Sequence, residues 1–121
     1  MRSTTMYKQG DVVLLPFPPT NQFASLAQAR PKNRPAVIVS ADWFFYLRGD
    51  YVVIALTSQP KRDCFDLEIR DYKQAGLLKP SVARIGKFLT VHPIIIIKKL
   101  GELTEDDQKN VLGRTMWPFC F

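Results

Sequence analysis

The stretches Arg34-Pro35-Ala36-Val37-Ile38-Val39-Ser40 and Tyr51-Val52-Val53-Ile54-Ala55-Leu56-Thr57 decide the fold. Both are short apolar runs with many β-branched residues, a pattern typical of buried β-strands. If the two strands pair directly as an antiparallel hairpin, the residue numbers of partners add to a constant. A symmetric closure then pairs Ser40 with Tyr51 and places Arg34 opposite Thr57. A slip by one residue would separate the last two side chains, so the predicted site depends on this register.

Four more strands and one helix are predicted around this hairpin. The strands are expected at residues 12–17, 65–70, 80–85 and 94–100. The strand at 65–70, the fourth of the six in chain order, has the clearest pattern, because Phe65, Leu67 and Ile69 alternate with charged residues as in a half-exposed strand. Thr104 and the three acids after it predict the start of a helix that runs to about Thr115, with Val111, Leu112 and Met116 on one face.

These elements predict a fold that is mainly β with a C-terminal helix, as a small closed barrel or a strongly curved sheet. The 121 residues suit one domain, 1–121. Gly76 is expected to break the chain before the strand at 80–85. Residues 41–50 are read as an aromatic connection, and residues 20–33 as a long loop, which in a small domain is more often functional than idle.

Composition favours a polyanionic partner. The formal net charge is +6, with 17 basic and 11 acidic residues. Cys64 and Cys120 have no pairing or metal-ligand spacing, and there is one histidine, so we expect reduced thiols, no metal and no cofactor. The longest aliphatic run, 94–97, is too short to cross a bilayer, and no secretory signal is visible. We therefore expect a cytoplasmic protein without a membrane partner.

Arg34 and Thr57 suit a phosphodiester. A guanidinium donates paired hydrogen bonds to phosphate oxygens and keeps its charge, and the hydroxyls of Thr57 and Ser58, with Gln59 just beyond, can bind further oxygens. RNA carries its own nucleophile, the 2′-hydroxyl, so its cleavage needs orientation and charge stabilisation but no metal. The alternative is that Arg34 forms a surface ion pair and that Thr57 only ends a strand. The residues alone favour neither the functional nor the structural interpretation.

Five ordered motifs, which together span nearly the whole chain, resemble the MazF/PemK toxins of type II toxin–antitoxin systems. They are residues 10–20 (GDVVLLPFPPT), 34–40 (RPAVIVS), 56–59 (LTSQ), 80–84 (PSVAR) and 99–103 (KLGEL). The resemblance implies an SH3-like β-barrel, a homodimer and a sequence-selective endoribonuclease that cleaves single-stranded RNA and arrests growth. It also implies products with 2′,3′-cyclic phosphate and 5′-hydroxyl ends, and a cognate antitoxin that blocks the RNA groove and joins the toxin in binding DNA.

The resemblance also assigns residues. The family's catalytic arginine falls on Arg34 and its catalytic threonine on Thr57, while an arginine near the scissile phosphate falls on Arg84. The aspartate that usually follows two positions later is Gly86 here, which puts the family's acid–base scheme in doubt for this chain. Lys87 is expected to add positive charge.

Other residues have two readings each. Arg30 and Lys32 alternate with Arg34 and are expected to follow an RNA backbone, the alternative being a solvated basic loop. The aromatic residues 43–46 are expected in the core or a dimer contact rather than stacked on bases. His92 is a weaker acid–base candidate because nothing directs it toward Arg34. The apolar tail, 116–121, is expected to pack on the barrel or a partner.

Two other functions remain open from the sequence. One is a CcdB-like, non-enzymatic poison of DNA gyrase, for which a C-terminal tryptophan, Trp117, is a minor argument. The other is a MazF-like protein that binds RNA but has lost activity, for which the argument is Gly86.

Overall fold

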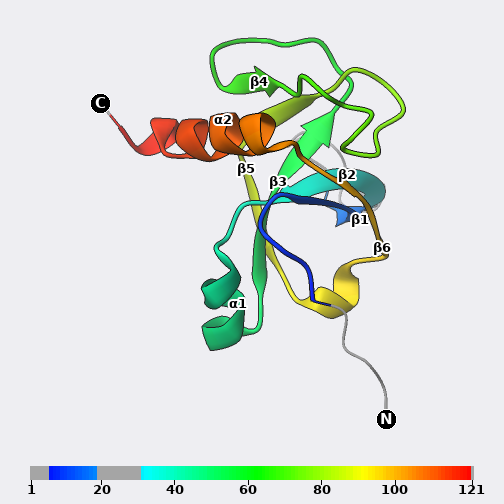
Figure 1. Ribbon diagram of the computed structural model, residues 1–121, viewed down its shortest axis with the longest axis vertical. Coiled ribbons are helices and arrows are strands. Elements are labelled where there is room, and N and C mark those ends of the chain that lie inside the picture. The colour runs from blue at the N-terminus through cyan, green and yellow to red at the C-terminus, as the bar shows by residue number, and fades with distance from the viewer. Residues whose placement is uncertain (1–5, 19–30, 121) are drawn as a thin grey trace.

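A computed structural model describes residues 6–18 and 31–120, and six strands within these ranges form one antiparallel sheet (Figure 1). The strands follow the order β4-β5-β3-β2-β1-β6 across the sheet. Their bounds are β1 (Asp11–Phe17), β2 (Lys32–Ile38), β3 (Tyr51–Thr57), β4 (Asp66–Glu68), β5 (Val82–Val91) and β6 (Lys98–Glu102). The helices are α1 (Asp42–Arg48) and α2 (Glu105–Thr115), with 3₁₀ turns η1 (Pro93–Ile95) and η2 (Trp117–Phe119).

The expected class, mainly β with a C-terminal helix, is confirmed, but the sheet is curved and open rather than closed. Its order ends at β4 and β6, and no ladder joins these strands in the described ranges. Residues 74–76 lie against β6 instead, where the Glu102 N–H donates to the Gln74 carbonyl at 3.3 Å. Gly76 and Gly101 permit this approach, because a Cβ on Gly76 would lie 2.0 Å from the Leu100 carbonyl oxygen and one on Gly101 2.6 Å from Ala75. A loop therefore occupies the place of a closing strand.

The limits of two strands differ from the prediction, one because of a proline and the other because a glycine lets the strand continue. The strand expected at 94–100 begins only at Lys98, because Pro93 starts the turn η1 and the His92 Nδ1 accepts the Ile94 N–H at 3.1 Å. The strand expected at 80–85 continues to Val91. It passes Gly86 at φ +102°, where the register with β3 shifts.

Helix α1 was not predicted. It occupies the connection between β2 and β3, and Gly49 at φ +76° ends it by donating its N–H to the Phe45 carbonyl at 2.7 Å. The Phe45 ring stacks on Tyr51, with centroids 4.5 Å apart and planes within 3°. A helix of seven residues is too short to be stable by itself, so its packing against β3 accounts for it.

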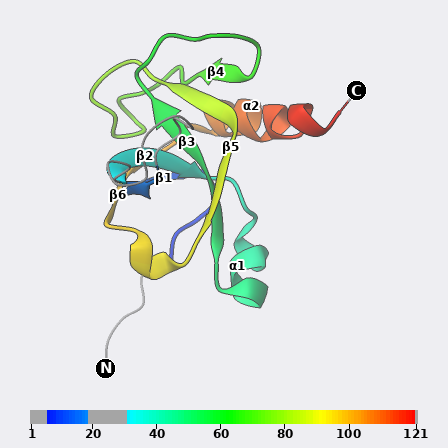
Figure 2. The same cartoon turned by 180° about the vertical axis from the view of Figure 1, so that it is seen from behind.

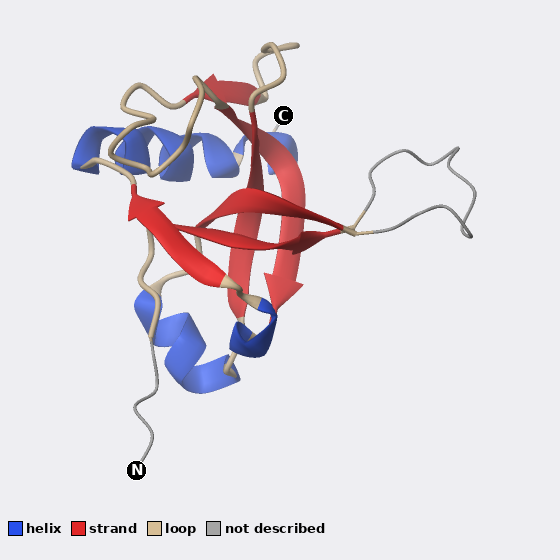
Figure 3. Ribbon diagram, turned by 90° about the vertical axis from the view of Figure 1, so that its right-hand side faces the viewer, coloured by secondary structure: helices blue, strands red, loops and turns tan. Residues whose placement is uncertain are grey.

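Helix α2 begins as predicted. The Thr104 hydroxyl accepts the Asp107 N–H at 3.1 Å as its N-cap. Val111 is buried and Leu112 partly buried, but Met116 lies beyond the helix and is exposed, contrary to the prediction. Figures 2 and 3 show α2 at the end of the molecule that carries β4, with α1 at the opposite end.

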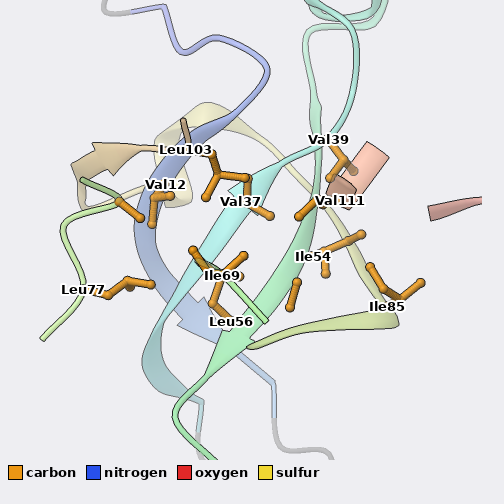
Figure 4. Close-up of a cluster of buried hydrophobic side chains, with 12 residues drawn as sticks. Val12, Val37, Val39, Ile54, Leu56, Ile69, Leu77, Ile85, Leu103 and Val111 are labelled. Atoms are coloured by element: carbon orange, nitrogen blue, oxygen red, sulfur yellow. The ribbon is translucent and has the colours of Figure 1, made fainter. Parts of the chain in front are cut away.

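Apolar residues cover both faces of the sheet. Alternation along β3 sends Ile54 and Leu56 into one buried cluster and Val53 and Ala55 into another. Figure 4 shows the first cluster, where side chains of the sheet meet Leu103 and Val111 from the α2 region. The second cluster holds Tyr51 and receives Phe45.

Candidate active site

Arg34 and Thr57 lie at the same end of neighbouring strands. The ladder between β2 and β3 pairs Ala36 with Ala55 and Ile38 with Val53, which is the register predicted from the symmetric closure. Two residues further along, the same register places Arg34 opposite Thr57. Because side chains alternate along a strand, both point to the face that carries Ala36 and Ala55.

These two side chains share a cavity of about 330 Å³ that we call the cationic cavity. It opens on the face of the second cluster, next to Phe17 and Ala55, and none of the described residues that line it is a carboxylate. Its polar and charged lining residues are Arg34, Thr57, Gln59, Arg62, Arg84 and Lys87. Four positive side chains around one hollow give it a positive charge, and an anion is the kind of ligand that such a lining favours.

A second cavity of about 510 Å³ adjoins the first, and Arg34, Thr57 and Gln59 line both. We call it the leucine-lined cavity because Leu14, Leu56, Leu77, Leu78 and Leu100 line it. Its wall includes Gly76 from the loop that replaces the closing strand. The predicted catalytic pair thus lies where an apolar hollow meets a cationic one.

The other residues predicted to bind RNA lie in different places. Gln59, Arg84 and Lys87 line the cationic cavity, and Ser58 lines the leucine-lined one. Lys32 is exposed on β2 and lines neither of the two. Arg30 lies outside the described residues.

The Thr57 side chain has a defined local geometry. Its Oγ1 accepts the Gln59 backbone N–H at 3.2 Å, so the hydroxyl closes a small turn at the end of β3. The hydroxyl proton is not used in this bond and can be donated to a ligand.

Sequence reasoning missed Arg62 and Asp66. Asp66 was expected on the solvent side of its strand and Phe65 in the core, but Asp66 is 1% exposed and Phe65 is exposed. The Asp66 carboxylate accepts hydrogen bonds from Arg84 Nη1, from the Arg62 backbone N–H at 2.9 Å and from Arg62 Nε at 3.4 Å. The ion pairs with arginine therefore place Asp66 in the interior and Phe65 at the surface, the opposite of what the alternation of apolar and charged residues suggested. The acid four residues after Arg62 is the only sequence signal that could have indicated the pair.

The backbone conformation at position 86 explains why this residue is glycine. Its φ of +102° lies in a region that L side chains rarely adopt, and a Cβ there would meet no atom within 4 Å. Conformation, not space, thus favours glycine at the position where the resemblance places an aspartate. The carboxylate that pairs with Arg84 comes instead from β4, where Asp66 is its register partner.

His92 lies away from this site. It is exposed, caps the turn η1 and lines neither cavity. In residues 6–18 and 31–120, no three His, Cys, Asp or Glu side chains group as metal ligands. No helix in these ranges is long and apolar enough to cross a membrane.

The aromatic residues 43–46 and the tail pack only in part. Phe45 reaches the core, but Trp43 and Tyr46 are exposed. In the tail, Phe119 stacks on Phe88 of β5 at 5.9 Å, and the Arg114 guanidinium lies 3.9 Å from the ring centroid of Trp117. Both tail rings keep exposed surface.

A family model described as "PemK-like, MazF-like toxin of type II toxin-antitoxin system" matches residues 8–116. The chain belongs to this family.

Solved structures share the MazF-like fold at low sequence identity. A MazE–MazF structure (Form-II) from Deinococcus radiodurans is 17% identical, with a TM-score of 0.71 over 96% of this chain and 97% of that chain. An endoribonuclease in complex with its cognate antitoxin, from a mycobacterial species, is 16% identical, with a TM-score of 0.70 over 94% and 95%. The Mycobacterium tuberculosis toxin MazF-mt6 is 16% identical, with a TM-score of 0.64 over 88% and 95%. No curated protein sequence matches the chain significantly.

Proposed function

We propose that this MazF-like toxin is a metal-independent, sequence-selective endoribonuclease of single-stranded RNA. The observation that carries the proposal is that Arg34 and Thr57 project from one end and one face of neighbouring strands into a shared cationic cavity. Family membership and the net charge of +6 support it.

In the proposed reaction the ribose 2′-oxygen attacks the adjacent phosphorus, and the bond to the 5′-oxygen breaks. The products are a 2′,3′-cyclic phosphate and a 5′-hydroxyl end. Arg34 stabilises the negative charge that grows on the non-bridging oxygens, and the Thr57 hydroxyl donates to one of them. Within residues 6–18 and 31–120, the two cavities have no carboxylate in their lining, so in this proposal the 2′-hydroxyl proton passes to water and water protonates the leaving oxygen.

The proposal includes two protein partners. Structures of similar fold are described as a toxin with MazE and as an endoribonuclease with its cognate antitoxin. We propose that a cognate antitoxin covers the cationic cavity of this chain and that the toxin acts on RNA in the cytoplasm. We also propose a homodimer, for which the exposed apolar surface of Met116, Trp117 and Phe119 is the supporting observation.

The test is cleavage of long single-stranded RNA in EDTA, with the ends of the products mapped. Wild-type protein should give discrete cuts with cyclic-phosphate ends. Arg34→Ala should abolish cleavage, and Thr57→Ala should slow it by about 100-fold, since each removes a donor to the developing charge. Arg48→Ala is the matched control, because it removes the same charge from exposed α1 at the other end of the molecule.

The same assay, combined with a DNA gyrase assay, addresses the other two functions. The exposed Trp117 is the structural observation that bears on a CcdB-like gyrase poison. Intact RNA together with inhibited gyrase would favour that function and contradict the nuclease. Intact RNA with unaffected gyrase would favour an inactive member of the family.

A further inference from the structure

We propose that Arg62 is a phosphate-binding residue and that the buried Asp66 positions it, together with Arg84, in the cationic cavity. The ligand is a phosphodiester of the RNA chain other than the one that is cleaved. This inference rests on the proposed function, and its test is chosen so that the two can fail separately.

The contacts form a compact unit across three parts of the chain. Asp66 on β4 lies in register with Arg84 on β5, and Arg62 comes from the connection between β3 and β4. One carboxylate oxygen, Asp66 Oδ2, accepts from both guanidinium groups and from the Arg62 backbone N–H. Both the position of the loop at Arg62 and the direction of its side chain are therefore tied to Asp66.

Burial places the negative charge behind the positive ones. The Asp66 side chain is 2% exposed, whereas the Arg84 side chain is 12% and the Arg62 side chain 62% exposed. Arg62 and Arg84 line the cationic cavity and Asp66 does not. A phosphate that enters the cavity thus contacts guanidinium groups and not the carboxylate.

Each arginine keeps donors for a ligand. A guanidinium carries five N–H donors in a planar fork, and Asp66 takes one side-chain donor from each arginine. The remaining forks match the geometry of phosphate oxygens. Because a held side chain loses less conformational freedom on binding, the pairing with Asp66 should strengthen the contact.

Arg62 is assigned to a phosphate that does not react because of where it lies. Arg34 and Thr57 stand together at the ends of β2 and β3, while Arg62 reaches the same cavity from the connection between β3 and β4. A contact to a non-reacting phosphate contributes equally to binding of substrate and transition state. Its loss should therefore raise KM and leave kcat less affected.

The first test measures binding of a random-sequence single-stranded 2′-O-methyl RNA pool, which cannot be cleaved, by fluorescence anisotropy over a salt series. Arg62→Ala should weaken binding about tenfold and reduce the slope of log K against log salt by about 0.7. Lys61→Ala removes the same charge one residue earlier, outside the cationic cavity, and should weaken binding less than about twofold. Equal effects of the two variants would overturn the inference.

The second test addresses Asp66 as a positioning residue. Asp66→Asn keeps the shape but loses the charge, and should weaken binding about as much as Arg62→Ala, with Asp66→Glu recovering part of the loss. The double variant Arg62→Ala/Asp66→Asn should lose less than the two single losses combined, because both act on one contact. A folded Asp66→Asn protein that binds like the wild type would contradict the role. If Asp66→Asn does not fold, the comparison of Arg62 with Lys61 still decides the inference.

Cleavage data separate this inference from the proposed function. If the wild type cuts RNA, Arg62→Ala should raise KM by about tenfold, with a smaller change in kcat. If the wild type cuts no RNA but the salt slopes differ as described, the nuclease proposal fails and the phosphate site stands. If the wild type cuts RNA and Arg62→Ala lowers only kcat, this inference fails and the nuclease proposal stands.

Discussion

Arg34 and Thr57 each stand two residues beyond a directly paired alanine, Ala36 on β2 and Ala55 on β3. Since two residues are one full repeat of a strand, both side chains extend from the same face of the sheet, toward the cationic cavity.

The first prediction concerns the planar shape of the charged group at position 34. Arg34→Lys keeps one positive charge but loses the planar fork, so cleavage should slow by about 100-fold. Binding of uncleavable RNA should weaken by no more than about threefold, because the charge is retained. Single-turnover cleavage and anisotropy would measure the two effects. Equal losses in both would show that Arg34 only binds.

The second prediction concerns the aspartate that the family resemblance places at position 86. Gly86→Asp should lower the free energy of unfolding by about 1–2 kcal/mol, because φ there is +102°. Urea unfolding would measure it, with Gly113→Ala as the control. Gly113 is an exposed residue of α2 with no neighbouring atom within 4 Å of an added Cβ, so that change should stabilise by about 0.5–1 kcal/mol. A Gly86→Asp protein that is as stable as the wild type would contradict the argument that the backbone conformation at position 86 favours glycine.

The third prediction concerns Asp107, a buried carboxylate that joins α2 to the segment after β4. Its two oxygens accept the backbone N–H groups of Arg70 at 3.0 Å and Asp71 at 2.9 Å. Asp107→Ala leaves both donors without this partner, so the free energy of unfolding should fall by about 2–4 kcal/mol. Asp106→Ala, one residue earlier and exposed, should cost less than about 1 kcal/mol. Similar costs in urea unfolding would argue against an anchoring role.

The fourth prediction concerns alkaline pH. Burial raises the pKa of Tyr51 above its ordinary value of 10.0, and its hydroxyl oxygen accepts the Tyr7 N–H at 2.9 Å. The folded protein therefore holds this proton more tightly than the unfolded chain. The resulting stability is present below pH 10.0 and is lost as the pH rises through the folded-state pKa.

Tyr51→Phe should reduce that alkaline loss. Its unfolding free energy should be about 1 kcal/mol lower at neutral pH, because the Tyr7 N–H loses its acceptor, and should fall less steeply above pH 10. Tyr46→Phe changes an exposed ring and should follow the wild-type curve. Thermal unfolding between pH 7 and 11 would compare the three proteins. Parallel curves for Tyr51→Phe and the wild type would refute the assignment.

Local sequence patterns predicted much of this structure. Turn formers and apolar runs indicated the hairpin of β2 and β3, and its symmetric closure gave the observed register. Thr104 indicated the start of α2 because an N-cap acts within one turn of the chain. Structural features that depend on residues close together in the sequence can therefore be predicted from periodicity and capping.

Features that depend on distant contacts were missed. Helix α1 is held by a stack between Phe45 and Tyr51, and Asp66 is buried because Arg84 lies in register on another strand. The sequence left a closed barrel and a strongly curved sheet as alternatives, and the structure has the curved, open sheet. The approach of residues 74–76 to β6 has no local signature apart from its glycines. The site pair was found through the hairpin, whereas Arg62 required knowledge of β4 and β5.

The open sheet has a consequence for solubility. An edge strand presents unpaired backbone groups that can recruit other chains into aggregates. Here one edge strand, β4, has three residues, and the other, β6, begins with Lys98 and Lys99 and has residues 74–76 against it. Short length, like charges and a covering loop all disfavour edge-to-edge polymerisation, so the free toxin should remain dispersed at high concentration even when no antitoxin is bound.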